Sequence, residues 1–182
     1  MRKLIASINM TLDGFCDHTS VEPDEEVHDY YADLLRNAGV ILYGRVTYQL
    51  MEYWRALVAK PSGEKSLDDF AITMDAVPKV VFSYTLTYLD WASARLAMQS
   101  LEAEVTLLKS QPGKDIYIGS PSLIVQLLNH QLVDELQLCI HPVLAGSGRP
   151  LFENIIGHRN LQFKQARNLT AGAMIVTYQL TY

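Results

Sequence analysis

The sequence has few cysteines, and their arrangement does not indicate a disulfide framework. Cys16 and Cys139 are the only two, they lie far apart, and neither belongs to a Cys-x-x-Cys pair. This usage is typical of a reducing compartment, so we expect a cytoplasmic location. The five histidines include no pair at the i, i+4 spacing of a helical zinc site, and we therefore expect no metal.

The chain also lacks the features of membrane and nucleic-acid-binding proteins. No run of about 18 apolar residues occurs, and the N-terminal apolar stretch is too short for a signal peptide. The formal net charge of −5 argues against nucleic acid or an anionic membrane as partner, because both need a clustered basic surface. We expect a small-molecule substrate, with no nucleic acid and no membrane.

Length and composition predict a single domain over residues 1–182. The hydrophobic fraction is 49% and the charged fraction 19%, which is enough apolar material for an ordinary globular core. A chain of this length buries roughly 70% of the surface that its unfolded state exposes, so it needs no disulfide or metal to fold. No repeat or linker divides it.

The first part of the sequence alternates between short apolar runs and longer helical patterns. Strands are predicted over residues 2–8, 40–43, 79–83 and 115–118. Helices are predicted over residues 24–38, 46–57, 66–76, 98–110 and 121–130. Ser66 is expected to cap the helix that it begins, with Asp69 three residues on.

From residue 133 the pattern becomes that of half-buried strands. Leu136, Leu138 and Ile140 share an apolar face, whereas Cys139 and His141 lie on the other face and are interpreted as structural or interfacial. Two more strands are predicted near 160–168 and 173–181. Strand–helix units followed by an antiparallel end indicate an α/β protein, with a mixed sheet and helices on its faces.

Glycine or hydroxyl residues follow three of the predicted strands. Open α/β sheets bind ligands at the carboxyl ends of their strands, where helix N-termini attract anions and glycine lets a phosphate approach the backbone. Gly44, Arg45 and Thr47 follow the second strand, and Arg45 can bind a phosphate through two hydrogen bonds. This turn therefore predicts a phosphate-bearing nucleotide, although each residue alone also fits a plain turn, a cap or a solvated charge.

Two further residues are candidates for the substrate side of the site. Asp13 precedes Gly14 after the first strand, where Asp-Gly fits either a turn or a substrate contact at the mouth of the site. His28 lies on the first helix, between the carboxylates of Glu25 and Asp29. A side chain there could orient a ligand or donate a proton, and the alternative is a solvated helix face.

Two segments resemble the dihydrofolate reductase-like family. They are 42–48, with the Tyr53-Trp54 pair that follows it, and 132–152, which includes Leu132-Val133-Asp134-Glu135-Leu136. The branch that the chain resembles most is typified by the reductase domain of bifunctional riboflavin-biosynthesis enzymes. The resemblance implies a three-layer fold with an eight-stranded mixed sheet, a homodimer, and hydride transfer from NADPH to a pteridine- or pyrimidine-like substrate.

The resemblance also implies roles for the residues at the strand ends. Gly44, Arg45 and Thr47 would hold the phosphates of NADPH. The residues implied for the adenosine-phosphate side are Ser83 and Thr85, and those implied for the pyrophosphate and nicotinamide are Gly119 and Ser120.

The sequence departs from this family in two places. Ser120 stands where the family often has a second glycine, and its side chain either adds bulk on the cofactor's path or binds a phosphate. The helix-borne acid of dihydrofolate reductases has no clear counterpart, because counting back from Gly44 reaches His28. The alternative to a reductase is a nucleotide-binding or dimeric interaction module of the same fold without turnover.

Overall fold

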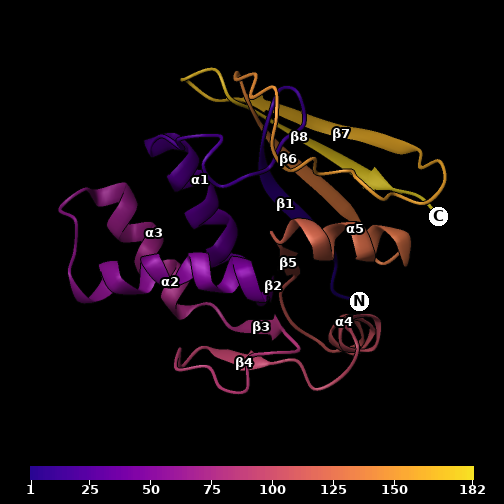
Figure 1. Cartoon of the computed structure of the whole chain (residues 1–182), viewed down its shortest axis with the longest axis horizontal. Coiled ribbons are helices and arrows are strands. Elements are labelled where there is room, and N and C mark those ends of the chain that lie inside the picture. Colours follow the sequence, from indigo (N-terminus) through magenta and orange to yellow (C-terminus); the bar gives the residue numbers. More distant parts are fainter.

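The computed structural model describes residues 1–182 as one sheet with helices on both of its faces (Figure 1). The strands are β1 (Leu4–Thr11), β2 (Val40–Gly44), β3 (Lys79–Phe82), β4 (Ala94–Leu96), β5 (Ile116–Ile118), β6 (Glu135–His141), β7 (Leu161–Asn168) and β8 (Met174–Leu180). The helices are α1 (Glu25–Arg36), α2 (Arg45–Ala59), α3 (Lys65–Ala76), α4 (Leu101–Ser110) and α5 (Pro121–Asn129).

The sheet is mixed and mostly parallel, as predicted. Its eight strands follow the order β4-β3-β2-β5-β1-β6-β8-β7. All neighbours from β4 to β6 are parallel, and β8 runs antiparallel to both β6 and β7. The carboxyl ends of β1, β2, β3 and β5 therefore meet at one edge of the sheet, where the sequence places its candidate residues.

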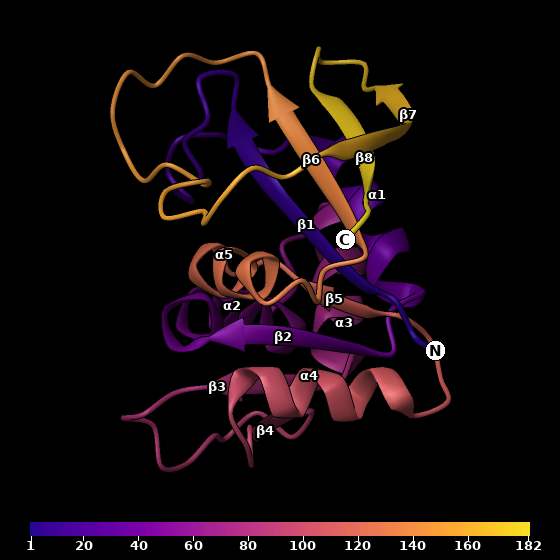
Figure 2. The ribbon, with the colours of Figure 1, turned by 90° about the vertical axis from the view of Figure 1, so that its right-hand side faces the viewer.

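Two apolar layers hold the helices against the sheet. Val40 and Leu42 of β2 belong to the cluster under α4 and α5, whereas Ile41 and Tyr43 belong to the cluster under α1, α2 and α3. This alternation follows from the two-residue period of a strand that is covered on both faces. Figure 2 shows α4 and α5 in front of the sheet and the other helices behind it.

All predicted helices and strands are present, although their ends are shifted. The structure differs from the prediction in one added strand and in one helix cap. The sequence pattern misses β4, which has three residues and lies at the edge of the sheet with only part of its surface buried. The prediction of Ser66 as a helix cap is wrong. The cap residue of α3 is Glu64, and Ser66 lies buried inside the first turn. The Asp68 carboxylate accepts hydrogen bonds from the N–H groups of Ser62 and Gly63, which fixes the earlier start.

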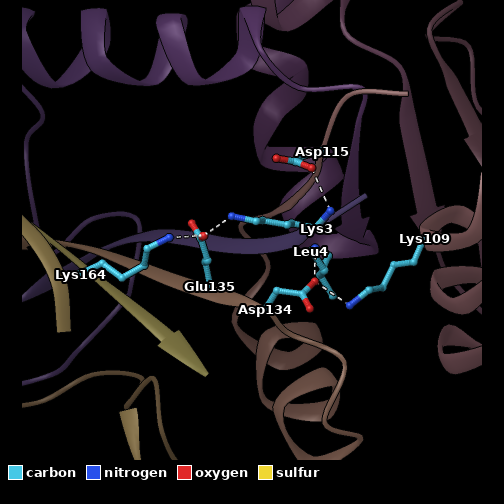
Figure 3. A network of polar contacts seen from close by, with 7 residues as sticks. All are labelled: Lys3, Leu4, Lys109, Asp115, Asp134, Glu135 and Lys164. Carbon is cyan, nitrogen blue, oxygen red and sulfur yellow. Dashed lines mark hydrogen bonds and ion pairs between the residues drawn. The ribbon is translucent and has the colours of Figure 1, made fainter. Parts of the chain in front are cut away.

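A carboxylate at the start of β6 joins the residue before β1 to the middle of β7 (Figure 3). Glu135 accepts hydrogen bonds from Lys3 at 2.6 Å and from Lys164 of β7 at 2.8 Å. Burial acts to raise the pKa of Glu135, but the two lysines outweigh it and the pKa is lowered. Glu135 lies at the edge of the sheet opposite the candidate site, so its role is structural.

The neighbouring carboxylate holds β1 and α4. Asp134 accepts hydrogen bonds from the backbone N–H of Leu4 at 2.7 Å and from Lys109 at 2.6 Å (Figure 3). The side chain of Lys109 is only 12% exposed, so Asp134 compensates a largely buried charge. The acids of the 132–136 segment thus stabilise the fold.

Lys79 is a buried lysine, and its titration predicts a pH-dependent stability. Its ammonium donates to the Val77 carbonyl and the Ser93 hydroxyl, both at 2.8 Å, and burial lowers its pKa from 10.5 to about 8. Between these values the unfolded chain binds more protons, so the Lys79 contribution to the free energy of unfolding rises with pH. We expect the stability of wild type relative to Lys79→Met to rise from pH 7.5 to pH 10, measured by urea unfolding. Parallel pH profiles would contradict this assignment.

Candidate functional site

A cavity of about 780 Å³ lies between the sheet and helices α1, α2 and α3. Most of its lining is apolar or aromatic, with Tyr31, Tyr43, Trp54 and Phe70 among the aromatic side chains. It reaches the carboxyl end of β5 at Gly119 and the first turn of α2 at Thr47. Its size suits a small organic ligand together with part of a cofactor.

The N-termini of α2 and α5 have no side chain that offsets their positive dipole ends. Neither helix has a side-chain cap, and neither has an acidic residue in its first turn. By contrast, Asp24 caps α1, and Glu25 and Glu26 follow it. The positive dipole ends of both helices and the N–H groups in the first turn of α2 therefore remain available to a phosphate. In α5 the backbone offers less, because Pro121 has no N–H and Leu123 donates to the Ser120 carbonyl.

A hydrogen bond joins these two helix starts. The N–H of Gly44 donates to the Ser120 hydroxyl oxygen at 2.9 Å, and Ser120 is only 1% exposed. The extra bulk of Ser120 relative to glycine is thus turned toward Gly44 and buried. A Cβ on Gly44 would lie 3.8 Å from Leu123, which is ordinary contact, so packing within the chain alone does not demand glycine there.

Arg45 and Thr47 both lie in the first turn of α2. Arg45 is exposed and its guanidinium contacts Gln49 at 3.1 Å, so no carboxylate competes for it. Thr47 is half-buried and lines the cavity. Their positions suit an anion held at the helix start and extending toward the cavity.

Ser83 and Thr85 lie beside this turn but outside the cavity. Gly44 pairs with Phe82 in the sheet, which places Ser83 next to the start of α2. The Ser83 hydroxyl accepts hydrogen bonds from the N–H groups of Thr85 and Leu86 and so forms a turn. No helix follows this strand directly; the chain continues to β4. The role of Ser83 and Thr85 toward a cofactor stays a prediction.

Gly119 brings the end of β5 close to β1. A Cβ on Gly119 would lie 3.3 Å from the Ser7 carbonyl oxygen, which is a tight contact. Gly119 and Ser7 both line the cavity. A side chain at residue 119 would therefore press on β1, and glycine avoids that contact.

Asp13 holds a loop and does not line the cavity. Its carboxylate accepts hydrogen bonds from the Thr11 hydroxyl and from the N–H groups of Ala145 and Gly146. These bonds, that from Thr11 foremost, lower the pKa of Asp13. The geometry favours the turn interpretation, and the cavity gives no support to a catalytic role.

His28 does line the cavity, among aromatic side chains. Its ring centroid lies 5.6 Å from that of Trp54 and 5.9 Å from that of Phe70. Burial lowers the pKa of His28, so the imidazole is uncharged at neutral pH. His28 is placed to contact a ligand, and its role as proton donor stays a prediction.

Sequence reasoning missed the polar groups on the cavity floor. Ser7 and Asn9 point to the α1 side of β1, and Tyr31 of α1 lines the same cavity. The hydroxyl groups of Ser7 and Tyr31 are buried and lie close to each other, and a side-chain hydrogen bond from Ser7 partly offsets the effect of burial, which raises the pKa of Tyr31. The signal was present: Ser7 and Asn9 are polar residues within a strand that is otherwise apolar and central in the sheet.

Cys139 and His141 form a buried chain with Asn9. The His141 Nε2 atom lies 2.9 Å from Asn9 Oδ1 and 3.6 Å from the Cys139 sulfur. Burial raises the pKa of Cys139 to about 12, so the sulfur remains a thiol and is no nucleophile at neutral pH. The structural interpretation of this pair therefore agrees with the geometry.

The sheet order and the cavity at its carboxyl edge define a dihydrofolate reductase-like fold. The chain belongs to the RibD C-terminal domain family, whose profile matches residues 2–175, and therefore to a family of reductases. A relative, the uncharacterized protein YyaP of Bacillus subtilis (strain 168), is 35% identical over 181 residues, which cover 97% of this chain and 94% of YyaP.

Two solved structures share this fold. A putative riboflavin biosynthesis protein from Shewanella sp. PV-4 superposes with a TM-score of 0.74 at 19% identity, covering 99% of each chain. Dihydrofolate reductase from Enterococcus faecalis, complexed with NADP(H), superposes with a TM-score of 0.66 at 13% identity, covering 99% of this chain and 97% of that one. No helix of the present structure combines the length and hydropathy needed to span a bilayer.

Proposed function

We propose that this protein is an NADPH-dependent reductase that transfers a hydride to a pteridine- or aminopyrimidine-like small molecule. The observation that carries the proposal is the pair of uncapped, acid-free helix starts joined by the Gly44–Ser120 hydrogen bond. Membership of the RibD C-terminal domain family supports the reductase class. The NADP(H) complex of the Enterococcus faecalis enzyme supports the identity of the cofactor.

The residues present fit such a cofactor. The N–H groups at the start of α2, with Arg45 and Thr47, would bind its phosphates, and Gly119 leaves room for its nicotinamide end at the cavity. Bound NADPH would supply the hydride. The chain would orient the substrate ring between α1 and the sheet. The aromatic side chains around Trp54 would exclude water from the reacting atoms.

Titration with NADPH and NADH tests the proposal. We expect NADPH fluorescence to change on binding, and Arg45→Ala to weaken NADPH by about tenfold, because a bidentate contact to its additional phosphate is lost. NADH lacks that phosphate and should lose less. Arg55→Ala is the matched control, since Arg55 also lies on α2 but pairs with Asp90 at 2.8 Å. No binding at millimolar NADPH or NADH would refute the proposal, and equal losses would remove Arg45 from this role.

A second candidate function is a nucleotide-binding or interaction module of the same fold without turnover. It is favoured by the engagement of Asp17, the one carboxylate that lines the cavity, with the backbone N–H of Arg149, and by the engagement of Asp13 in a loop. Cofactor binding without NADPH oxidation across pterins, aminopyrimidines and carbonyl compounds would support this candidate.

A homodimer is the assembly that we propose for this chain. All residues of the edge strand β7 are exposed, including Phe163 at 59% and Leu161 at 41%, and Met174 of β8 is 41% exposed. An exposed edge strand with apolar side chains is a common surface for pairing with a second copy. Light scattering coupled to size-exclusion chromatography should give twice the mass of the chain, and a monomer would reject the dimer.

A further inference from the structure

A second cavity, of about 450 Å³, lies between the start of α1, the end of β6 and the turn that joins β7 to β8. Only Val21 and Val27 belong to the lining of both this cavity and the candidate site. None of the residues proposed for the cofactor or the substrate lines it. The second cavity is therefore a separate place where a ligand can bind.

The histidine of this cavity has a ring nitrogen without a partner. His141 is 6% exposed, and its Nε2 atom lies 2.9 Å from Asn9 Oδ1. Its Nδ1 atom forms no hydrogen bond within the chain, yet it is not sealed inside the protein. Because His141 lines the second cavity and not the first, Nδ1 faces the second cavity. Polar atoms of buried side chains are nearly always paired, so this nitrogen lacks a partner that the protein does not supply.

The contact with Asn9 determines what the free nitrogen of His141 can bind. With the Asn9 amide as placed, its Oδ1 atom accepts a hydrogen bond from the Nε2–H group of His141. Burial lowers the pKa of His141, although the Asp24 carboxylate acts to raise it, so the ring carries one proton at neutral pH. That proton is on Nε2, and Nδ1 is then an acceptor. The missing partner is therefore a hydrogen-bond donor.

The charged side chains around the second cavity are acidic. Its lining includes the carboxylates of Glu22 and Asp24 and no lysine or arginine. Asp24 caps α1 through Oδ1, which accepts a hydrogen bond from the N–H of Val27 at 2.9 Å, so its second oxygen is free. Asp24 affects His141 through its charge and not through a hydrogen bond, so the two groups lie near each other without contact. A donor between them that carries a positive charge can bind both.

The rest of the lining indicates an organic cation. Val27 and Ala173 are buried and form an apolar part of the wall, next to Pro142. Such a surface favours an alkyl chain, because burial removes apolar area from water. A metal ion fits less well, since no three His, Cys, Asp or Glu side chains are placed to hold one.

We propose that the second cavity binds a small alkylammonium ion, whose N–H groups donate to Nδ1 of His141 and to the free carboxylate oxygen of Asp24. An ammonium at Nδ1 also keeps the ring proton on Nε2, and with it the orientation of the Asn9 amide in the wall of the first cavity. The His141–Asn9 hydrogen bond thus joins the second cavity to the candidate site. This site lies outside the proposed reductase chemistry and does not depend on NADPH binding.

Titration of the full chain with n-butylammonium tests the proposal. This amine is charged at pH 7.5, as a lysine side chain is, whereas n-butanol has a similar shape without the charge. We expect n-butylammonium to bind with a Kd on the order of a few millimolar, measured by calorimetry, and n-butanol to bind at least tenfold more weakly.

Nitrogen-15 NMR of the histidine rings locates the bound amine. The Nδ1 signal of His141 should move toward that of a hydrogen-bonded nitrogen as n-butylammonium is added, and its Nε2 should stay protonated. The His141 signals are assigned by their loss in His141→Gln. If that variant does not fold, they are assigned by the Nε2–H proton, which burial and the bond to Asn9 protect from exchange with water.

Asp24→Asn removes the charge from the cavity and keeps the helix cap, since asparagine and aspartate cap helices about equally well. It should weaken n-butylammonium about tenfold, while the melting temperature falls by no more than about 4 °C. Glu25→Gln is the matched control. Glu25 lies in the same first turn of α1 but is exposed and does not line the cavity, so this variant should bind the amine as wild type does.

Four results would overturn the ammonium site. They are no detectable binding of n-butylammonium, equal affinity for n-butanol, equal affinity of wild type and Asp24→Asn, and a His141 Nδ1 signal that does not move at saturation. The last result would mean that the amine binds elsewhere on this acidic protein, whose formal net charge is −5. None of these measurements uses NADPH, so the site and the reductase proposal stand or fall separately.

Discussion

Asp134→Ala is expected to lower the free energy of unfolding by about 3 kcal/mol, the largest stability loss predicted for a single residue here. The substitution removes the acceptor for the N–H of Leu4, a fully buried residue at the start of β1. It also leaves Lys109, whose side chain is 12% exposed, without its carboxylate. For a chain of this size the melting temperature should fall by roughly 6–12 °C.

Two control variants separate the hydrogen bond to Leu4 from the ion pair with Lys109 and from the effect of an exposed ion pair. Asp134→Asn keeps an oxygen for the Leu4 N–H but loses the charge that faces Lys109, so it should show about half of the loss. Asp33→Ala removes an exposed ion pair with Arg36, in which the Asp33 side chain is 74% exposed, and should change stability by less than about 0.5 kcal/mol. Equal effects of Asp134→Ala and Asp33→Ala would show that the Asp134 contacts do not stabilise the fold.

Most of the fold follows from local patterns in the sequence. The buried strands β2, β3 and β5 are short apolar runs ended by glycine or serine, and the helices carry apolar residues at helical spacing. The order of the strands is not local information. The family resemblance supplied only an eight-stranded mixed sheet, and the order β4-β3-β2-β5-β1-β6-β8-β7 comes from the structure. β4 was missed because a three-residue edge strand buries too little to impose a period on its sequence.

The two halves of the candidate site differ in how well the sequence predicts them. The phosphate half depends on backbone N–H groups at helix starts, and glycine after an apolar run is a local sign of such a turn. The cavity half includes the polar residues Ser7, Asn9 and Tyr31, which come from two elements and meet only through tertiary packing. Asp13 was predicted as a site residue because its partners could not be read from the sequence. Ala145 and Gly146 lie far away in sequence, and their N–H groups hold the Asp13 carboxylate in a loop.

Gly44→Ala is expected to weaken NADPH by at least tenfold while leaving the fold intact. The backbone of Gly44, with φ −78° and ψ 164°, is open to any residue, and a Cβ there would make only ordinary contacts with Leu123 and the Ser120 hydroxyl. Packing within the chain therefore gives alanine little penalty. The added methyl group lies between the starts of α2 and α5, where the proposed phosphates must approach the backbone most closely.

Paired measurements on this variant separate crowding of a cofactor from damage to the protein. The melting temperature of Gly44→Ala should stay within about 2 °C of wild type. Gly119→Ala should instead lower both stability and NADPH affinity, since its Cβ meets the Ser7 carbonyl at 3.3 Å. Unchanged NADPH affinity in Gly44→Ala would show that the cofactor does not bind in the gap between these helices. The reductase proposal would then lose its central observation.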